Sequence, residues 1–312
     1  MLLYRVLPVF IVIPASLSAI LYEGRVPSGS LDPASLDSSA DPFLTAVRGS
    51  EDASYYTSAV TDAIAPTPLW DVDEETISVM IDNSSVFLPG GSNPQNGFRR
   101  TELIAEQDGS ATTLYSLMEI GTTAFHFSIM ADTDKPLNYD HEYQIVFIEP
   151  SDGTHVFGIV LGTPFNTDAS DEEAHSIRVL AHDSSILFET TFTESVWHNF
   201  AVLVDWSALT LQAYYSVDAD DLAEVSDVIP NTGVSSGSAG QGDFHFGVLK
   251  VRRPNSRVIR PLINDEQLPL PDPSDPSHQS DVVHYGIQEG TTEGLFYSGV
   301  FVEDLEDGLT TS

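Results

Sequence analysis

Two glutamates have the residue type and the neighbours that acid/base chemistry requires. Glu102 follows Arg100 at a spacing of two residues, and Glu142 precedes Gln144 at the same spacing. Alternate residues of a strand share a face, so each glutamate would lie on a polar face beside a charged or amide side chain. Cleavage of a glycosidic bond needs two carboxyl groups, one protonated and one ionised. The sequence does not indicate which of the two is the acid.

The stretches that carry these glutamates are expected to be two strands that line one groove. In Gly97–Ile104 and His141–Glu149, polar side chains alternate with apolar ones. The alternation places Tyr143, Ile145 and Phe147 on the face opposite to the second glutamate. The groove face would therefore be open to water or to a ligand, because a core face would not hold opposite charges at alternate positions.

Glu149 is the alternative catalytic carboxylate. It reaches the groove face if a β-bulge lies between Gln144 and Glu149, since an extra residue reverses the alternation. An isolated Arg-x-Glu sequence is more often a solvated ion pair on the protein surface than part of an active site. For Arg100 and Glu102 both explanations remain open at this point.

Further side chains are candidates for substrate contacts. Arg100 would hold a carboxylate ionised, and Gln144 would hydrogen-bond sugar hydroxyls. Histidines flanked by aromatic residues are more often partly buried than catalytic, but several in one sheet can shape a site. The predicted substrate-binding residues are Arg99, Arg100, Gln144, His126, His198, His245 and Tyr297.

Other kinds of chemistry have no support in the sequence. The histidines lack the short spacing of a compact metal site, so we expect no metal and no organic cofactor. There is no Gly-x-Ser-x-Gly motif of the serine hydrolases, and Gly90-Gly91 lacks the lysine of a phosphate-binding loop.

Composition limits the partners. The 312 residues carry 47 acidic and 12 basic side chains, a formal net charge of −35. This charge repels nucleic acid and anionic membrane surfaces and disfavours a polyanionic substrate. A neutral polysaccharide bound by a monomer is the expected partner.

The first residues predict a secreted protein. Residues 1–19 have one early positive charge, an apolar run too short to span a bilayer, and small residues at the end, which is the layout of a signal peptide. Asn83-Ser84-Ser85 is a glycosylation sequon, with Asn83 as the acceptor. The chain has no cysteine, so the secreted protein would have no disulfide.

The rest of the chain predicts an all-β fold. Short strand-like stretches recur at close intervals with almost no helical periodicity, which is typical of a two-sheet antiparallel β-jelly roll with long loops. Val86–Leu88 and Leu114–Met118 are among the expected strands. We expect one catalytic domain over residues 20–312, with a proline-rich insertion loop at residues 253–290.

Six blocks of the sequence together resemble one family. They are Arg99–Ile104, Phe125–Met130, Glu142–Ile145, Trp197–Asn199, His245–Leu249 and Phe296–Phe301. In this order they resemble glycoside hydrolase family 131 of fungi, over about Tyr22 to Glu303. The resemblance implies a secreted β-jelly roll with an open groove that hydrolyses β-glucans with 1,3, 1,4 or 1,6 linkages, with inversion, and it points to Glu102 and Glu142 as the acid/base pair. The sequence departs from the family at Tyr143, where a histidine is expected, and in the length of the insertion.

Two other functions remain open at this point. The Arg-Thr-Glu-Leu stretch is also similar to jelly-roll lyases of alginate and glucuronan, which need cationic groups to neutralise a polyuronate. A patch around Arg99, Arg100, Lys250, Arg252 and Arg253 would provide such groups locally. A non-catalytic glucan-binding module is the third possibility, and its binding would not depend on Glu102.

Overall fold

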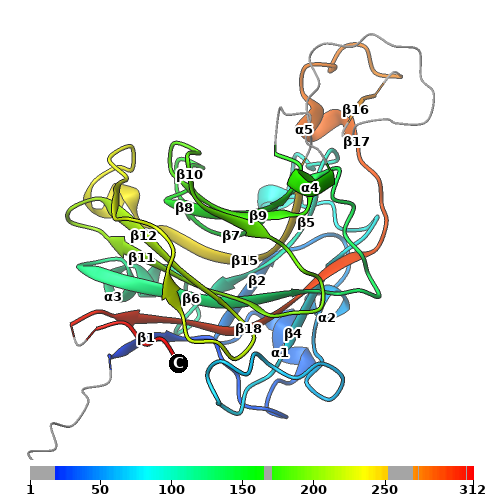
Figure 1. Ribbon diagram of the computed structural model, residues 1–312. Coiled ribbons are helices and arrows are strands. Elements are labelled where there is room, and N and C mark those ends of the chain that lie inside the picture. Colours follow the sequence, from blue (N-terminus) through cyan, green and yellow to red (C-terminus); the bar gives the residue numbers. More distant parts are fainter. Residues whose placement is uncertain (1–17, 165–170, 252–269, 273, 307) are drawn as a thin grey trace, which may run out of the picture.

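Antiparallel strands in two stacked sheets make up most of the protein. The structure is a computed structural model that describes residues 18–164, 171–251, 270–272, 274–306 and 308–312. Sheet A and sheet B lie face to face with the hydrophobic core between them (Figure 1). The predicted two-sheet β-jelly-roll architecture is confirmed.

Sheet A is the layer that does not contain the predicted catalytic strands. In the described residues its order is β13 (Ala223–Glu224), β12 (Thr210–Val217), β11 (His198–Asp205), β6 (Thr122–Ala131), β18 (Glu293–Asp304), β4 (Ile77–Ile81) and β3 (Thr57–Ala59). Two further strands join it at the side: β1 (Ile20–Glu23) pairs with β18, and β14 (Ile229–Pro230) pairs with β12.

Sheet B carries the predicted catalytic strands. Its order is β10 (Ile186–Thr191), β9 (Ser176–Ala181), β8 (Phe157–Gly162), β7 (Glu142–Pro150), β15 (Gly242–Val251), β5 (Arg99–Ala105) and β2 (Phe43–Val47). The strands with Glu102 and Glu142 are therefore not adjacent, because β15 lies between them and pairs with both. The turn at Ser151–Gly153 joins β7 to β8 as an antiparallel hairpin, as its turn-forming residues predict.

Alternation of side chains builds the core from both sheets. Phe125 of sheet A contacts Phe157 and Phe244 of sheet B edge to face, with ring centroids 5.7 and 5.1 Å apart. All three side chains are buried. Burying a large apolar side chain contributes about 1.5–3 kcal/mol, so such pairs hold the sheets in register.

Short helices occupy the connections. They are α1 (Pro33–Ser38), α2 (Ala53–Tyr56), α3 (Thr112–Met118), α4 (Asp171–Ala174) and α5 (Val282–Tyr285), with 3₁₀ turns η1 (Pro89–Gly91) and η2 (Gly237–Gly240). The strand predicted at Leu114–Met118 is wrong. Leu114 and Met118 are four residues apart and both are buried, so they form the core-facing side of a helix. The strand predicted at Val86–Leu88 is also wrong, because this segment is an irregular loop before η1.

Part of the predicted insertion forms an arm. Residues 270–290 contain α5 and a small sheet of β16 (Leu270–Pro271) and β17 (Gly286–Ile287), which stand apart from the sandwich (Figure 1). Residues 252–269, which include the first part of the insertion, lie outside the described residues. Residues 1–17 of the predicted signal peptide also lie outside them. No helix in the described part of the chain is long and apolar enough to cross a membrane.

Candidate active site

The outer face of sheet B brings the predicted carboxylates onto one surface through two bulges. Pairing between β7 and β8 shifts between Gln144 and Val146, and pairing between β15 and β7 shifts between Phe246 and Leu249. The first shift reverses the alternation of β7, so Ile145 and Val146 both join the core.

The bulge in β7 changes the face on which Phe147 and Glu149 lie. Phe147 packs on the outer face against His245, so its predicted position on the core side is wrong. Glu149 shares that face and contacts Arg100, which is where a bulge was expected to bring it. A local extra residue reverses every side chain after it, and strict alternation cannot anticipate this.

Glu102 is the centre of a buried charged cluster on this face. The Nε atom of Arg100 donates to Oε1 of Glu102 at 2.6 Å, and the Nη2 atom donates to Oε2 at 3.0 Å. His245 donates from Nδ1 to Oε2 at 2.7 Å. Arg100 also reaches Glu149, with Nη2 3.4 Å from Oε2. One guanidinium therefore bridges two carboxylates.

This cluster fixes the ionisation of Glu102. Burial alone would raise the pKa of its carboxyl, but the charge of Arg100 and the hydrogen bond from His245 outweigh burial and lower the pKa to about 2. The side chain of Glu102 is 0% exposed, whereas that of Glu149 is 32% exposed. Glu102 is thus an ionised group enclosed by its partners, and it cannot serve as a proton donor.

A stack of three rings connects this cluster to the next strands. Phe147 lies between His245 and His155, with ring centroids 4.7 and 4.3 Å away and nearly parallel planes. Burial, with the nearby His245, lowers the pKa of His155 to about 4, so this imidazole is neutral above that pH. The stack fixes the His245 ring, and because its Nδ1 atom is bonded to Glu102, the Nε2 atom is the ring nitrogen left for other contacts.

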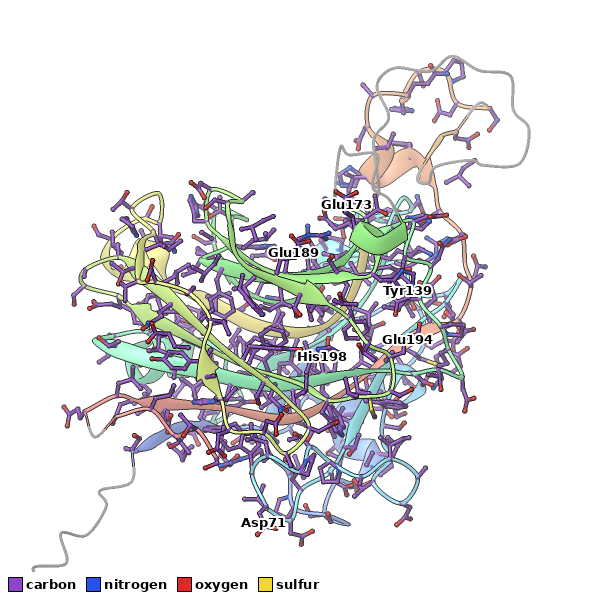
Figure 2. The ribbon with its side chains drawn as sticks, in the orientation of Figure 1. Asp71, Tyr139, Glu173, Glu189, Glu194 and His198 are labelled. Carbon is purple, nitrogen blue, oxygen red and sulfur yellow. The ribbon has the colours of Figure 1, made fainter. Side chains whose placement is uncertain are left out.

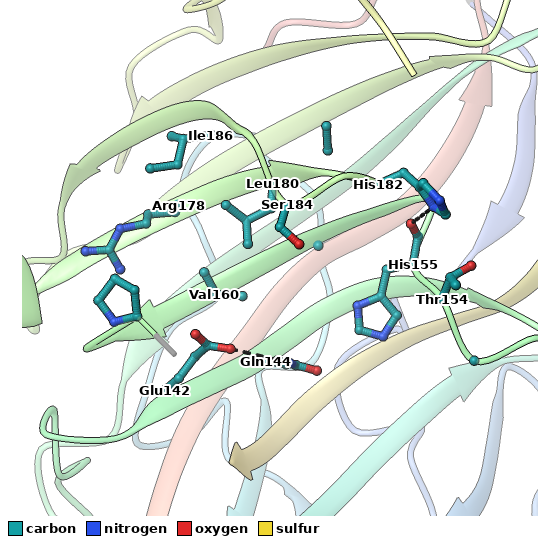
Figure 3. Close-up of a pocket in the computed structure, with 14 residues that line it drawn as sticks. Glu142, Gln144, Thr154, His155, Val160, Arg178, Leu180, His182, Ser184 and Ile186 are labelled. Atoms are coloured by element: carbon teal, nitrogen blue, oxygen red, sulfur yellow. Dashed lines mark hydrogen bonds between the residues drawn. The ribbon is translucent and has the colours of Figure 1, made fainter. Parts of the chain in front are cut away.

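A pocket of about 600 Å³ lies over β7 to β10 and contains Glu142 (Figure 3). Gln144 donates from Nε2 to Oε1 of Glu142 at 3.4 Å, and both side chains line the pocket. Val160, Leu180 and Ile186 supply apolar surface. Hydroxyls and C–H faces of a sugar need this mixture of polar and apolar contacts.

A family model described as the glycoside hydrolase 131 catalytic N-terminal domain matches residues 20–308. The chain belongs to glycoside hydrolase family 131. It is accordingly a glycoside hydrolase, and its substrate is a carbohydrate. The lyase and the non-catalytic binding module weighed from the sequence give way to this assignment. No curated protein matches the sequence.

Solved structures show the same fold. The catalytic domain of a family 131 β-glucanase from Podospora anserina has a TM-score of 0.65 and 22% identity, with 94% of this chain and 98% of that chain covered. The catalytic domain of a family 131 protein from Coprinopsis cinerea has a TM-score of 0.65 and 19% identity, with 94% and 97% covered. An alginate lyase from Alteromonas sp. 272 is a weaker match, with a TM-score of 0.38, 14% identity, and 80% and 95% covered.

Two predicted substrate contacts of this family 131 domain lie on sheet A instead of in the groove. His126 is buried under the outer face of sheet A, where its Nε2 lies 2.9 Å from Oε1 of Glu303 and its ring stacks on Phe301. His198 is also buried on sheet A (Figure 2). Its Nδ1 lies 2.7 Å from the hydroxyl of Tyr215. Their predicted role is wrong, because the strands that carry them belong to the other layer.

Two further predicted contacts point away from the groove. Arg99 is on the face opposite to Arg100, and it donates to the carbonyl oxygens of Asn96, Phe98 and Gln288. Tyr297 is buried between the sheets. The prediction that Arg99 and Tyr297 contact substrate is therefore wrong. The residues that do share the outer face of sheet B are Arg100, Glu102, Glu142, Gln144, Glu149 and His245.

Sequence reasoning missed several groove residues. Phe147, His155, Arg178 and His182 were not predicted, although Arg178 alternates with the core residues Ile177 and Val179. Arg178 donates to Glu189 at 2.7 Å and to the carbonyl oxygens of Gly162 and Glu173. It thus holds the edge of the pocket in shape.

Tyr143, which stands where the family resemblance predicts a histidine, has a structural role of its own. Its hydroxyl donates to Oε2 of Glu293 at 2.7 Å, and Lys250 donates to Oε1 of the same carboxylate at 2.7 Å. Lys250 also donates a hydrogen bond to Glu289, which lies at the end of the arm. Tyr143 thus belongs to a buried network that anchors the arm to sheet B. Asn83 is exposed, and its glycosylation stays a prediction.

Buried carboxyls predict that the domain is most stable in mild acid. Burial raises the pKa of Glu74 to about 7 and that of Glu119 to about 9. Such carboxyls stabilise the fold fully when the pH is below about 4.3, their pKa in the unfolded chain. This stabilisation is lost as the pH rises through their pKa values in the folded protein. The pKa of Glu102 is lowered instead of raised, so this residue has the opposite effect on stability. Its stabilising contribution is lost as pH falls from about 4.3 toward 2.

We therefore expect the melting temperature to be highest near pH 4–5. Between pH 5 and pH 8 it should fall by roughly 5 °C or more, since 1 kcal/mol shifts the melting temperature of a chain of this size by about 2–4 °C. Calorimetry against pH measures this. Glu119→Gln, which keeps an acceptor for the amide of Gly242, should flatten the decline. An unchanged decline in this variant would assign it to Glu74 or to general repulsion among the acidic side chains.

Proposed function

We propose that this glycoside hydrolase is a secreted enzyme that cleaves neutral β-glucans, with β-1,3, β-1,4 or β-1,6 linkages, by general acid/base catalysis. The observation that carries the proposal is the ionised Glu102 cluster on the same face of sheet B as Glu142 and its pocket. The β-glucanase activity named for the Podospora anserina domain supports the substrate class.

Glu142 is the proposed proton donor to the leaving oxygen. Of the two predicted carboxylates, Glu102 is held ionised and enclosed, so the proton has to come from the other. Glu142 lines the pocket, where a glycosidic oxygen can approach it. A positioned acid of this kind accelerates cleavage by about 10²–10⁴-fold.

Glu102 is proposed to supply the negative charge that supports His245 as the general base. Its carboxylate binds Nδ1–H of His245 and leaves Nε2 as an acceptor for a proton of the attacking water. The ionised carboxylate then stabilises the imidazolium that forms. Glu149 is the second candidate for the base, because it is partly exposed and Arg100 binds it.

The cations of the site favour a neutral substrate. Arg100 is engaged by Glu102 and Glu149, and Arg178 is engaged by Glu189 and two carbonyl oxygens. Neither guanidinium is free to neutralise a uronate carboxylate, which elimination requires. The net charge of −35 acts in the same direction.

Secretion and inversion complete the proposal. The matched family domain begins at residue 20, immediately after the predicted signal peptide, and this supports secretion. Inversion is expected because the water that His245 activates attacks the anomeric carbon directly, so that no covalent glycosyl–enzyme intermediate forms. Proton NMR of the first products tests it, since inversion gives α-anomers from a β-glucan, and β-anomers would show retention.

Mass spectrometry of products formed in heavy-oxygen water tests the reaction. The protein is incubated with β-glucan and, separately, with polyglucuronate. We expect one heavy oxygen in each new reducing end from β-glucan and no product from polyglucuronate. Unsaturated, unlabelled uronates would establish elimination instead. Labelled products from another neutral glycan, with none from β-glucan, would overturn the substrate class and leave the hydrolase standing.

A further inference from the structure

Tyr297 contacts strands β7 and β15 of sheet B from the core side. It belongs to β18 of sheet A, is 0% exposed, and points across the core to sheet B. Its hydroxyl lies 2.5 Å from the carbonyl oxygen of Gly247 on β15 and 3.1 Å from that of Ile145 on β7. One hydroxyl on the opposite sheet therefore contacts both β15, which carries His245, and β7, which carries Glu142 and Glu149.

Both carbonyl oxygens belong to the bulges. On β7, Gln144 and Val146 have partners on β15 and on β8, but in the described strands Ile145 between them has a partner on neither. On β15, Gly247 falls within the pairing shift between Phe246 and Leu249. A buried carbonyl oxygen without a ladder partner costs free energy unless another donor reaches it. Tyr297 reaches both with its single O–H hydrogen, as a shared donor whose shorter contact is to Gly247.

The two bulges determine the geometry of the catalytic face. The bulge at Ile145 turns Phe147 outward, where it packs against the ring of His245. Gly247 lies directly opposite Glu102, so closely that a Cβ atom there would be 3.0 Å from Cγ of Glu102. The carbonyl oxygens that Tyr297 holds are thus in the residues that place His245 and Glu102.

We propose that Tyr297 is a positioning residue for catalysis: its hydroxyl fixes the bulges of β7 and β15, and through them the orientation of Glu102 and His245. The proposal rests on the proposed function of that pair. Burial raises the pKa of Tyr297, so the hydroxyl stays a donor over the whole working pH range. Tyr297 makes this contact without touching the substrate.

Tyr297→Phe tests the proposal because it removes only the hydroxyl. We expect kcat on β-glucan to fall by roughly 10–100-fold with KM changed less than about threefold, since small displacements of catalytic groups mainly affect the transition state. The pH profile of kcat should also shift, because the bond between Glu102 and His245 would loosen. Tyr22→Phe is the matched control: Tyr22 is buried and its hydroxyl donates to the carbonyl oxygen of Pro42 at 2.9 Å, away from the groove.

A rescue variant separates hydrogen bonding from packing. A para-aminophenylalanine at position 297 keeps the ring and offers two N–H donors to the two carbonyl oxygens. It should restore kcat to within about threefold of the parent protein. If Tyr297→Phe lowers the melting temperature but leaves kcat and the pH profile like those of Tyr22→Phe, the hydroxyl is only structural and the proposal fails.

Hydrogen exchange tests the same proposal without activity. In the parent protein, peptides over residues 143–150 and 244–249 should exchange only through global unfolding, and in Tyr297→Phe they should exchange faster than the β9 peptide. Fast local exchange of these peptides in the parent protein would overturn the proposal even if the variant did not fold. A parent protein inactive on β-glucan would contradict the proposed function, while the exchange result would still decide whether Tyr297 holds the bulges.

Discussion

Glu142→Gln is expected to lower kcat on β-glucan by about 10²–10⁴-fold, because an amide cannot donate a proton to the leaving oxygen. The substitution keeps the size of the side chain and an oxygen that Gln144 can bind. KM and the melting temperature should therefore change little. Steady-state kinetics and thermal unfolding of the purified variant measure the three quantities.

Glu149→Gln is the matched control for this variant. It makes the same chemical change on the same strand and face of sheet B. We expect a loss in kcat of less than about tenfold, since Glu149 binds Arg100 at 3.4 Å without closing the cluster around Glu102. A loss in this control as large as that in Glu142→Gln would move the acid/base assignment to Glu149.

Glu102→Gln is the second variant with a large expected effect. It removes the charge that compensates Arg100, whose exposure is only 9%. It also replaces one of the two carboxylate oxygens that accept from Arg100 and His245 with an NH2 group, which is a donor. Breaking a buried ion pair by removing one partner costs about 3–5 kcal/mol. The loss in kcat should reach about 10²–10³-fold, because the imidazole would no longer be held in one tautomer. Unfolding curves and kinetics below the melting range measure both effects.

Glu303→Gln provides a comparison for stability without catalysis. Glu303 is a buried glutamate bound to His126 on sheet A, so the pair resembles Glu102 and His245 but lies outside the groove. We expect it to destabilise the fold while kcat stays within about threefold of the parent protein. If both variants lost activity in proportion to stability, Glu102 would have no role in the reaction beyond holding the fold.

The sequence predicted the architecture well because two-residue alternation was strong in most strands. The pairs Arg100 with Glu102 and Glu142 with Gln144 were assigned to the outer face for this reason, and they lie there. The predictions for Phe147 and for the segment Leu114–Met118 were wrong for different reasons. A bulge reversed the alternation at Phe147, and a four-residue spacing in a short segment favoured a helix at α3.

Strand periodicity does not show which sheet a strand joins. His126, His198 and Tyr297 sit in strand-like, aromatic-rich segments much like the one around His245, yet only His245 is on sheet B. The assignment depends on pairings between residues that are far apart in the sequence, such as Ile129 with His198 and Ile104 with His245, and local propensity does not encode these. For the same reason the contact of Tyr297 with both bulges became evident only in the structure.

The most direct test of the account compares two substrates of Glu142→Gln. One is β-glucan, and the other is a 2,4-dinitrophenyl β-glycoside of a glucan oligosaccharide, whose leaving group departs without a proton. If Glu142 is the acid, the variant loses about 10²-fold or more on β-glucan but less than about tenfold on the dinitrophenyl substrate. Equal losses on both substrates would contradict its role as the proton donor.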